Sequence, residues 1–191
     1  KNFVVSLPDD VFNSQGNLYT LFMDNCGLST LNPSWFAPLR SLEVLNLYYN
    51  SFTVIAENAF ENLSNLIILD VSYSLGGTPT IHSNAFRALT NLYQINLSNM
   101  QLQGIDAGWF ATTRNLFHIY LNFNRIEVIP NGAFANITAL RSLNMWQNQL
   151  KTVRREAFGF LGSLTLIDFD TNTINALDER IFDDAVELRS F

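Results

Sequence analysis

Apolar residues recur along the chain with a fixed period, in a run of the form L-x-x-L-x-L. The runs are 24 residues apart except for one step of 26, and they begin at Leu18, Leu42, Leu66, Leu92, Leu116, Leu140, Leu164 and Leu188. Side chains alternate between the two faces of a strand. Each run therefore predicts a short strand whose apolar side chains point into a core that neighbouring repeats share.

A second column is formed by position 19 of the repeat. It is phenylalanine in every instance: Phe12, Phe36, Phe60, Phe86, Phe110, Phe134, Phe158 and Phe182. We expect these rings to pack from the convex side and to stack on one another, because paired aromatic rings stabilise a core beyond the area they bury.

Position nine forms a third column, which is asparagine at Asn50, Asn124, Asn148 and Asn172. An asparagine amide can bond backbone groups of adjacent turns where the chain leaves the strand and lacks sheet partners. Cys26, Ser74 and Met100 interrupt the column. Met100 cannot supply these bonds, so we expect water or a local distortion at that turn.

Segments 42–66 and 140–164, LEVLNLYYNSFTVIAENAFENLSNL and LRSLNMWQNQLKTVRREAFGFLGSL, carry a family resemblance. They resemble the typical 24-residue leucine-rich repeat of extracellular proteins, such as Toll-type receptor ectodomains and insect leucine-rich immune proteins. The resemblance implies an α/β solenoid, a right-handed horseshoe. We expect a concave parallel sheet of about seven or eight short strands, and a convex side of loops and short helical or 3-10 turns.

We interpret residues 1–191 as a single domain. It would comprise an incomplete first repeat over 1–17, repeats that begin at 18, 42, 66, 92, 116, 140 and 164, and the start of a further repeat at 188–191. The cysteine-rich caps that such proteins usually carry are not visible. We expect either that caps lie outside this chain or that a partner chain covers the ends.

Composition narrows the function classes. The formal net charge is −6, which weighs against nucleic-acid partners because phosphate binding needs clustered Lys and Arg. No apolar run reaches the roughly 20 residues of a membrane span. The single cysteine, Cys26, is interpreted as structural. His82 and His118 occupy different positions of different repeats. We therefore expect no catalytic residues, no metal site, no cofactor and no enzymatic activity.

Three sequons fit the pattern N-x-[ST] for glycosylation in a secreted protein: Asn62, Asn96 and Asn136. Asn62 and Asn136 occupy the same convex position of two repeats, where a glycan would be tolerated. Asn96 falls on the strand face. The sequons favour an extracellular location, either as a secreted protein or as the ectodomain of a membrane protein, although abundant Asn, Ser and Thr also produce sequons by chance.

The strand face is the candidate binding surface. Its aromatic residues fall into two groups, one early and one late along the chain. We interpret both groups as candidate contact residues, because exposed Tyr and Trp are enriched in binding hot spots. Preference of aromatic side chains for strands is the other explanation. The groups are Tyr48, Tyr49 and Tyr73, then His118, Tyr120, Phe123 and Trp146.

Asp168 and Asp170 lie on the same face. They could meet a basic partner or contribute to a calcium site, but a solvated acidic face is the more common role. A two-residue insertion with Gly76-Gly77 makes residues 72–81 another candidate loop, or a merely tolerated one.

The sequence thus favours a non-enzymatic extracellular recognition module that binds a protein or glycoconjugate through its concave face, in innate immunity or receptor signalling. The alternative is a structural or assembly scaffold, a homo-oligomer paired through the solenoid ends or the convex side.

Overall fold

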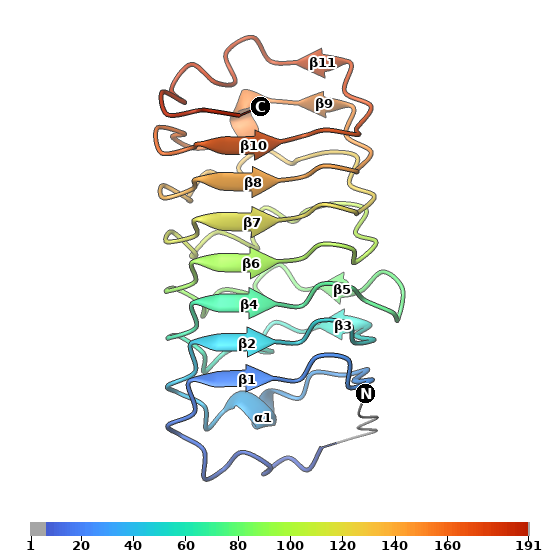
Figure 1. The fold of residues 1–191 in the computed structure, drawn as a ribbon, viewed down its shortest axis with the longest axis vertical. Coiled ribbons are helices and arrows are strands. Elements are labelled where there is room, and N and C mark those ends of the chain that lie inside the picture. The colour runs from blue at the N-terminus through green and yellow to red at the C-terminus, as the bar shows by residue number, and fades with distance from the viewer. Residues whose placement is uncertain (1–6, 191) are drawn as a thin grey trace.

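The computed structural model describes residues 7–190 as a stack of similar turns (Figure 1). One strand of each turn joins a seven-stranded parallel sheet. Its strands, in spatial order, are β1 (Thr20–Phe22), β2 (Val44–Asn46), β4 (Ile68–Asp70), β6 (Gln94–Asn96), β7 (His118–Tyr120), β8 (Ser142–Asn144) and β10 (Leu166–Asp168). The predicted parallel sheet and stacked solenoid are confirmed.

The sheet register follows the repeat. Leu21 pairs with Leu45 and Leu45 with Leu69, while Leu69 pairs with Ile95 across the longer turn. Each of these central strand residues is directed into the core, and Leu45, Leu69 and Ile95 are fully buried. The two extra residues of the long turn are therefore accommodated outside the sheet.

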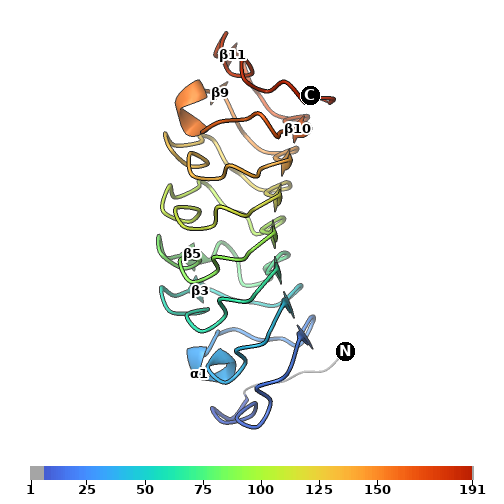
Figure 2. The same cartoon turned by 90° about the vertical axis from the view of Figure 1, so that its left-hand side faces the viewer.

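The opposite side of the stack is mostly turns and loops, as Figure 2 shows. It includes one short helix, α1 (Pro33–Phe36), and a 3-10 helix over Arg155–Ala157. Two further pairs of strands form outside the main sheet. They are β3 (Val54–Ile55) with β5 (Thr80–Ile81), and β9 (Thr152–Val153) with β11 (Ala176–Leu177).

A continuous column of phenylalanine rings fills the core behind the sheet. Neighbouring rings lie with their centroids between 5.6 and 6.5 Å apart. The rings in contact are Phe36, Phe60, Phe86, Phe110, Phe134 and Phe158, and all six are buried. Each turn thus contributes one ring that is covered by the turns above and below it.

Each asparagine of the position-nine column bonds to the turn before its own. The Oδ1 atom of Asn50 accepts from the backbone N–H of Cys26 and Leu28, and its Nδ2 donates to the carbonyls of Met23 and Leu47. Asn124 and Asn148 form the same kind of bonds to the turns that precede them. These amides can be buried without a loss of stability, because their polar atoms form hydrogen bonds.

An asparagine in place of Met100 would bond to the preceding turn, and that turn carries the insertion. Backbone carbonyls replace the missing amide there: the N–H of Ser74 donates to the carbonyl of Asn99 at 3.2 Å, and that of Leu75 to Asn50 at 2.8 Å. Met100 itself is fully buried. Backbone carbonyls therefore take the place of the side-chain acceptor in the turn before Met100.

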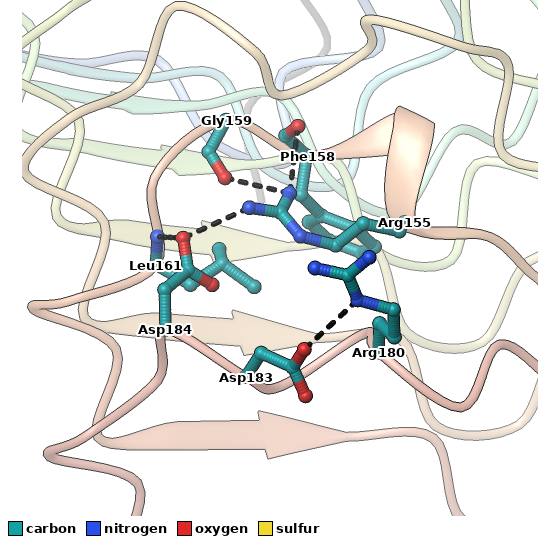
Figure 3. Close-up of polar contacts among 7 residues, drawn as sticks. All are labelled: Arg155, Phe158, Gly159, Leu161, Arg180, Asp183 and Asp184. Atoms are coloured by element: carbon teal, nitrogen blue, oxygen red, sulfur yellow. Dashed lines mark hydrogen bonds and ion pairs between the residues drawn. The ribbon is translucent and has the colours of Figure 1, made fainter.

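An arginine clamp holds the back of the last turns together (Figure 3). The guanidinium of Arg155 donates to the carbonyls of Phe158 and Gly159 and to the carboxylate of Asp184 at 2.8 Å. Asp184 also accepts from the backbone N–H of Leu161. This clamp links adjacent turns through two residues that are 29 positions apart in the sequence.

Candidate recognition surface

The chain leaves every strand of the main sheet through one residue in the left-handed conformation. This residue is at position eight of the repeat, with φ between 50° and 63°: Asn25, Tyr49, Tyr73, Asn99, Phe123, Gln147 and Thr171. Asparagine tolerates this conformation, but other L-residues are disfavoured by about 1–2 kcal/mol. Tyrosine or phenylalanine at this position is therefore not what the fold alone would select.

Position five is largely committed to the turn that follows it. Its side-chain oxygen accepts the backbone N–H two residues further on, as Asn46 does from Tyr48 and Asn144 from Trp146. Asp70, Asn96 and Asp168 do the same. Such bonds are the usual way in which Asn and Asp stabilise turns. The recurrence of Asn and Asp at this position was the sequence signal for this role, and our sequence analysis missed it.

The three early aromatic residues form a tyrosine cluster, Tyr48, Tyr49 and Tyr73. All three ring pairs are in contact, with centroids 5.5–5.7 Å apart. Tyr48 and Tyr73 keep 37% and 40% of their surface exposed. Burial raises the pKa of the Tyr48 hydroxyl, and the neighbouring Tyr73, Tyr49 and Asp70 raise it further. The cluster presents an apolar surface with hydroxyl groups.

The later aromatic residues divide into two groups. Phe123 and Trp146 form one pair, with ring centroids 4.3 Å apart, and Phe123 is 37% exposed. His118 stacks on Tyr120 with a centroid distance of 6.4 Å. Burial lowers the pKa of His118, so its imidazole is neutral near pH 7.

His118 also meets two aromatic residues that the sequence analysis did not select. Its ring lies 5.4 Å from those of both Tyr93 and Phe117. These two residues precede strands β6 and β7 and lie at the margin of the sheet. Nothing in the repeat consensus distinguishes that position, and only the stacking of adjacent turns brings them together.

The two aspartates have local partners. Asp168 accepts from the backbone N–H of Asp170, and Asp170 accepts from that of Thr171 at 2.8 Å. Asp170 is exposed. Within residues 7–190, no group of three or more His, Cys, Asp and Glu side chains is placed to hold a metal ion. The cysteine of the asparagine column, Cys26, is partly buried and free.

The three sequons lie in different surroundings. Asn62 and Asn136 are exposed on turns of the convex side. Asn96 is partly buried in β6, where its Nδ2 donates to Asp70 and its Oδ1 accepts from the hydroxyl and backbone N–H of Ser98. A glycan on Asn96 would disrupt these bonds.

The inserted loop leaves the stack beside β5, on the side toward which the strands of the main sheet point (Figure 1). A Cβ atom on Gly76 would clash with the backbone carbonyl of Ser51. Glycine is therefore required where the loop crosses the preceding turn. Leu75 is 54% exposed on the same loop.

Comparison with known proteins agrees with this architecture. A family model described as leucine rich repeat matches residues 1–52, 16–75, 41–102, 90–150 and 138–191. The chain belongs to the leucine-rich-repeat family.

Its relatives include Toll-type receptors. Toll-like receptor 2 type-1 of Gallus gallus is 29% identical over 117 residues, which cover 59% of this chain and 14% of the receptor. Toll-like receptor 8 of Homo sapiens is 31% identical over 120 residues, 55% of this chain and 11% of that receptor. The chain thus spans a small part of the relatives it matches.

Solved structures of Toll-type proteins share this fold. The chain superimposes on the TLR13–ssRNA13 complex with a TM-score of 0.87 at 28% identity, over 94% of this chain and 25% of that one. The Toll–Spatzle complex of Drosophila matches with a TM-score of 0.86 at 23% identity, over 96% and 24%. The described residues therefore share their fold with parts of these two Toll-type structures. None of the helices within residues 7–190 has the length and apolarity to cross a membrane.

Proposed function

We propose that this leucine-rich-repeat chain is a non-enzymatic recognition module, exposed outside the cell or in an endosomal lumen, that binds a protein partner in innate immunity. The contact surface is the outward face of the main sheet, with the tyrosine cluster and the Phe123–Trp146 pair as its anchors. Tyr120 and His118 complete the surface between them.

The observation that carries the proposal is the left-handed backbone beneath three bulky aromatic residues. Tyr49, Tyr73 and Phe123 occupy a position where Asn25 and Asn99 show that asparagine fits. Backbone strain of this kind concentrates at functional sites. Large aromatic side chains at such an exposed position favour binding, because they bury much area on contact with a partner.

The relatives supply the class of partner. The Toll structure was solved with Spatzle, and another structural neighbour is the LRIM1/APL1C complex, with a TM-score of 0.79 at 19% identity. TLR13 was solved with single-stranded RNA, which the sequence analysis had set aside as a partner class for this chain. The net charge of −6 favours protein over RNA here.

The test is a screen of the purified chain against an array of secreted proteins, followed by surface plasmon resonance on each protein that binds. The double variant Tyr120→Ala/Trp146→Ala should weaken the specific interaction at least about tenfold, since hot-spot truncations cost about 2 kcal/mol or more. The variant Val128→Ala removes an exposed side chain outside the main sheet and should bind as the wild type does.

A single-stranded RNA oligonucleotide is measured in parallel at physiological salt. The proposal fails if the RNA binds more tightly than every protein on the array. It also fails if each protein that binds is unaffected by the double variant while thermal melting shows that variant to be folded.

A further inference from the structure

A shallow groove of about 570 Å³ runs along the margin where the strands of the main sheet begin. This margin faces the viewer in Figure 2. It is separate from the tyrosine cluster and the Phe123–Trp146 pair, which follow the strands. Residues from adjacent turns line the groove in two parallel rows, one polar and one mainly apolar, in which Glu43 stands between Tyr19 and Ile67.

The apolar row consists of residues that directly precede the strands. Tyr19, Ile67 and Tyr93 are exposed by 60%, 37% and 39%. Beyond the groove, the ring of Tyr93 stacks on that of Phe117 with centroids 4.7 Å apart and planes inclined by 20°. The guanidinium of Arg141 lies 4.7 Å from the centroid of Phe117. The row thus ends on a stacked platform that holds the Tyr93 ring in place.

The polar row consists of asparagines that stand two residues before the residue that precedes each strand: Asn65, Asn91 and Asn115. The Nδ2 atom of Asn65 donates to the carbonyl of Arg40 at 2.8 Å, and that of Asn115 donates to Thr90 at 3.0 Å. These bonds direct the amide nitrogens toward the preceding turn. The amide oxygens, together with the carboxylate of Glu43, are left to accept hydrogen bonds from a ligand.

We propose that this margin groove binds an uncharged linear oligosaccharide. Sugar rings present hydroxyl donors along their edges and C–H groups on their faces, which complement the acceptors of the polar row and the rings of Tyr19 and Tyr93. Successive rows are about 4.8 Å apart, the distance between paired strands. This distance is close to the length of one sugar unit in an extended chain, so consecutive sugars meet consecutive turns. Glu43 in the groove disfavours acidic sugars.

None of the groove asparagines lies in a sequon, because Leu-Ile, Leu-Tyr and Leu-Phe follow Asn65, Asn91 and Asn115. The sugar is therefore a bound ligand here and not a covalent attachment. Asn62 and Asn136 are not among the residues that line the groove.

The experiment is isothermal titration calorimetry of the full chain with cellohexaose, chitohexaose and maltohexaose, and with a heparin hexasaccharide as the acidic comparison. We expect at least one neutral hexasaccharide to bind and the heparin fragment to bind more weakly. Tyr93→Ala should lower the affinity about tenfold, the effect expected for one lost stacking contact. Tyr93→Phe keeps the ring and should bind within about twofold of the wild type.

Asn91→Ala is the mildest test of the polar row and should weaken binding severalfold without a change in melting temperature. The sheet-face variant Tyr120→Ala/Trp146→Ala should bind the sugar normally, which separates this proposal from the proposed protein-binding function. The inference is overturned if no neutral hexasaccharide binds, if heparin binds best, or if Tyr93→Ala binds as tightly as the wild type.

Discussion

The Oδ1 atom of Asn124 accepts a hydrogen bond from the backbone N–H of Met100 at 3.0 Å, although Met100 occupies the equivalent position one repeat earlier. The asparagine column therefore acts backward along the chain. A repeat that lacks the asparagine is still held by the asparagine of the next repeat. The turn left without an amide partner is the one before the gap, and here that turn contains the insertion.

Replacement of Asn124 by Leu should destabilise the fold by about 3 kcal/mol or more, because several buried backbone groups lose a side-chain partner. Those groups are the N–H of Met100 and Leu102 and the carbonyls of Leu97 and Leu121. Urea denaturation followed by circular dichroism measures the loss. Met100→Leu is the matched control, a volume-conserving change expected to cost less than about 1.5 kcal/mol. Equal losses in the two variants would contradict the backward-acting column.

The Arg155–Asp184 clamp should contribute more to stability than an ion pair on the surface. Arg155→Ala removes two hydrogen bonds to carbonyls and leaves a partly buried carboxylate without its cation (Figure 3), so we expect a loss of about 2 kcal/mol. Lys151 and Glu127 pair at the same 2.8 Å distance but are both more than half exposed. Lys151→Ala should therefore cost less than about 1 kcal/mol. Thermal unfolding of the two variants measures both losses, and an equal loss in the two would contradict the role of the clamp.

Stability should fall in acid partly through Asp178. Its pKa is lowered by hydrogen bonds from the backbone N–H groups of Arg180 and Arg155. A carboxyl group with a lowered pKa in the folded state contributes stability above its ordinary pKa, and that contribution disappears as the pH drops through the lowered value. Asp178→Asn should therefore flatten the pH dependence of the melting temperature below about pH 4. A variant with the same acid profile as the wild type would exclude this role.

Glycosylation should distinguish the three sequons. In a eukaryotic secretory host we expect glycans on Asn62 and Asn136, which are exposed, and none on Asn96, which is bonded within the sheet. Intact mass spectrometry before and after enzymatic deglycosylation counts the glycans, and the variants Asn62→Gln and Asn136→Gln assign them. A glycosylated Asn96 would show that β6 is accessible before the sheet closes.

The repeat pattern by itself determined the architecture. Apolar residues at a fixed period can be buried only by stacking, because no single turn can cover its own core. The Phe column and the asparagine column followed from the same periodicity, and each side chain lies where its column requires. The leucine-rich-repeat family was also evident from the sequence, since the 24-residue period and the phenylalanine column match its typical repeat.

Tertiary structure alone decided which surface positions are free. The recurrence of Asn and Asp at position five signalled a role in turns, and the structure shows which backbone N–H each of these side chains accepts from. The pattern could not join Tyr93, Phe117 and Arg141 into one platform, because they are 24 residues apart and touch only when the turns stack. Periodicity specifies what is buried, whereas contacts between neighbouring turns specify what remains available to a ligand.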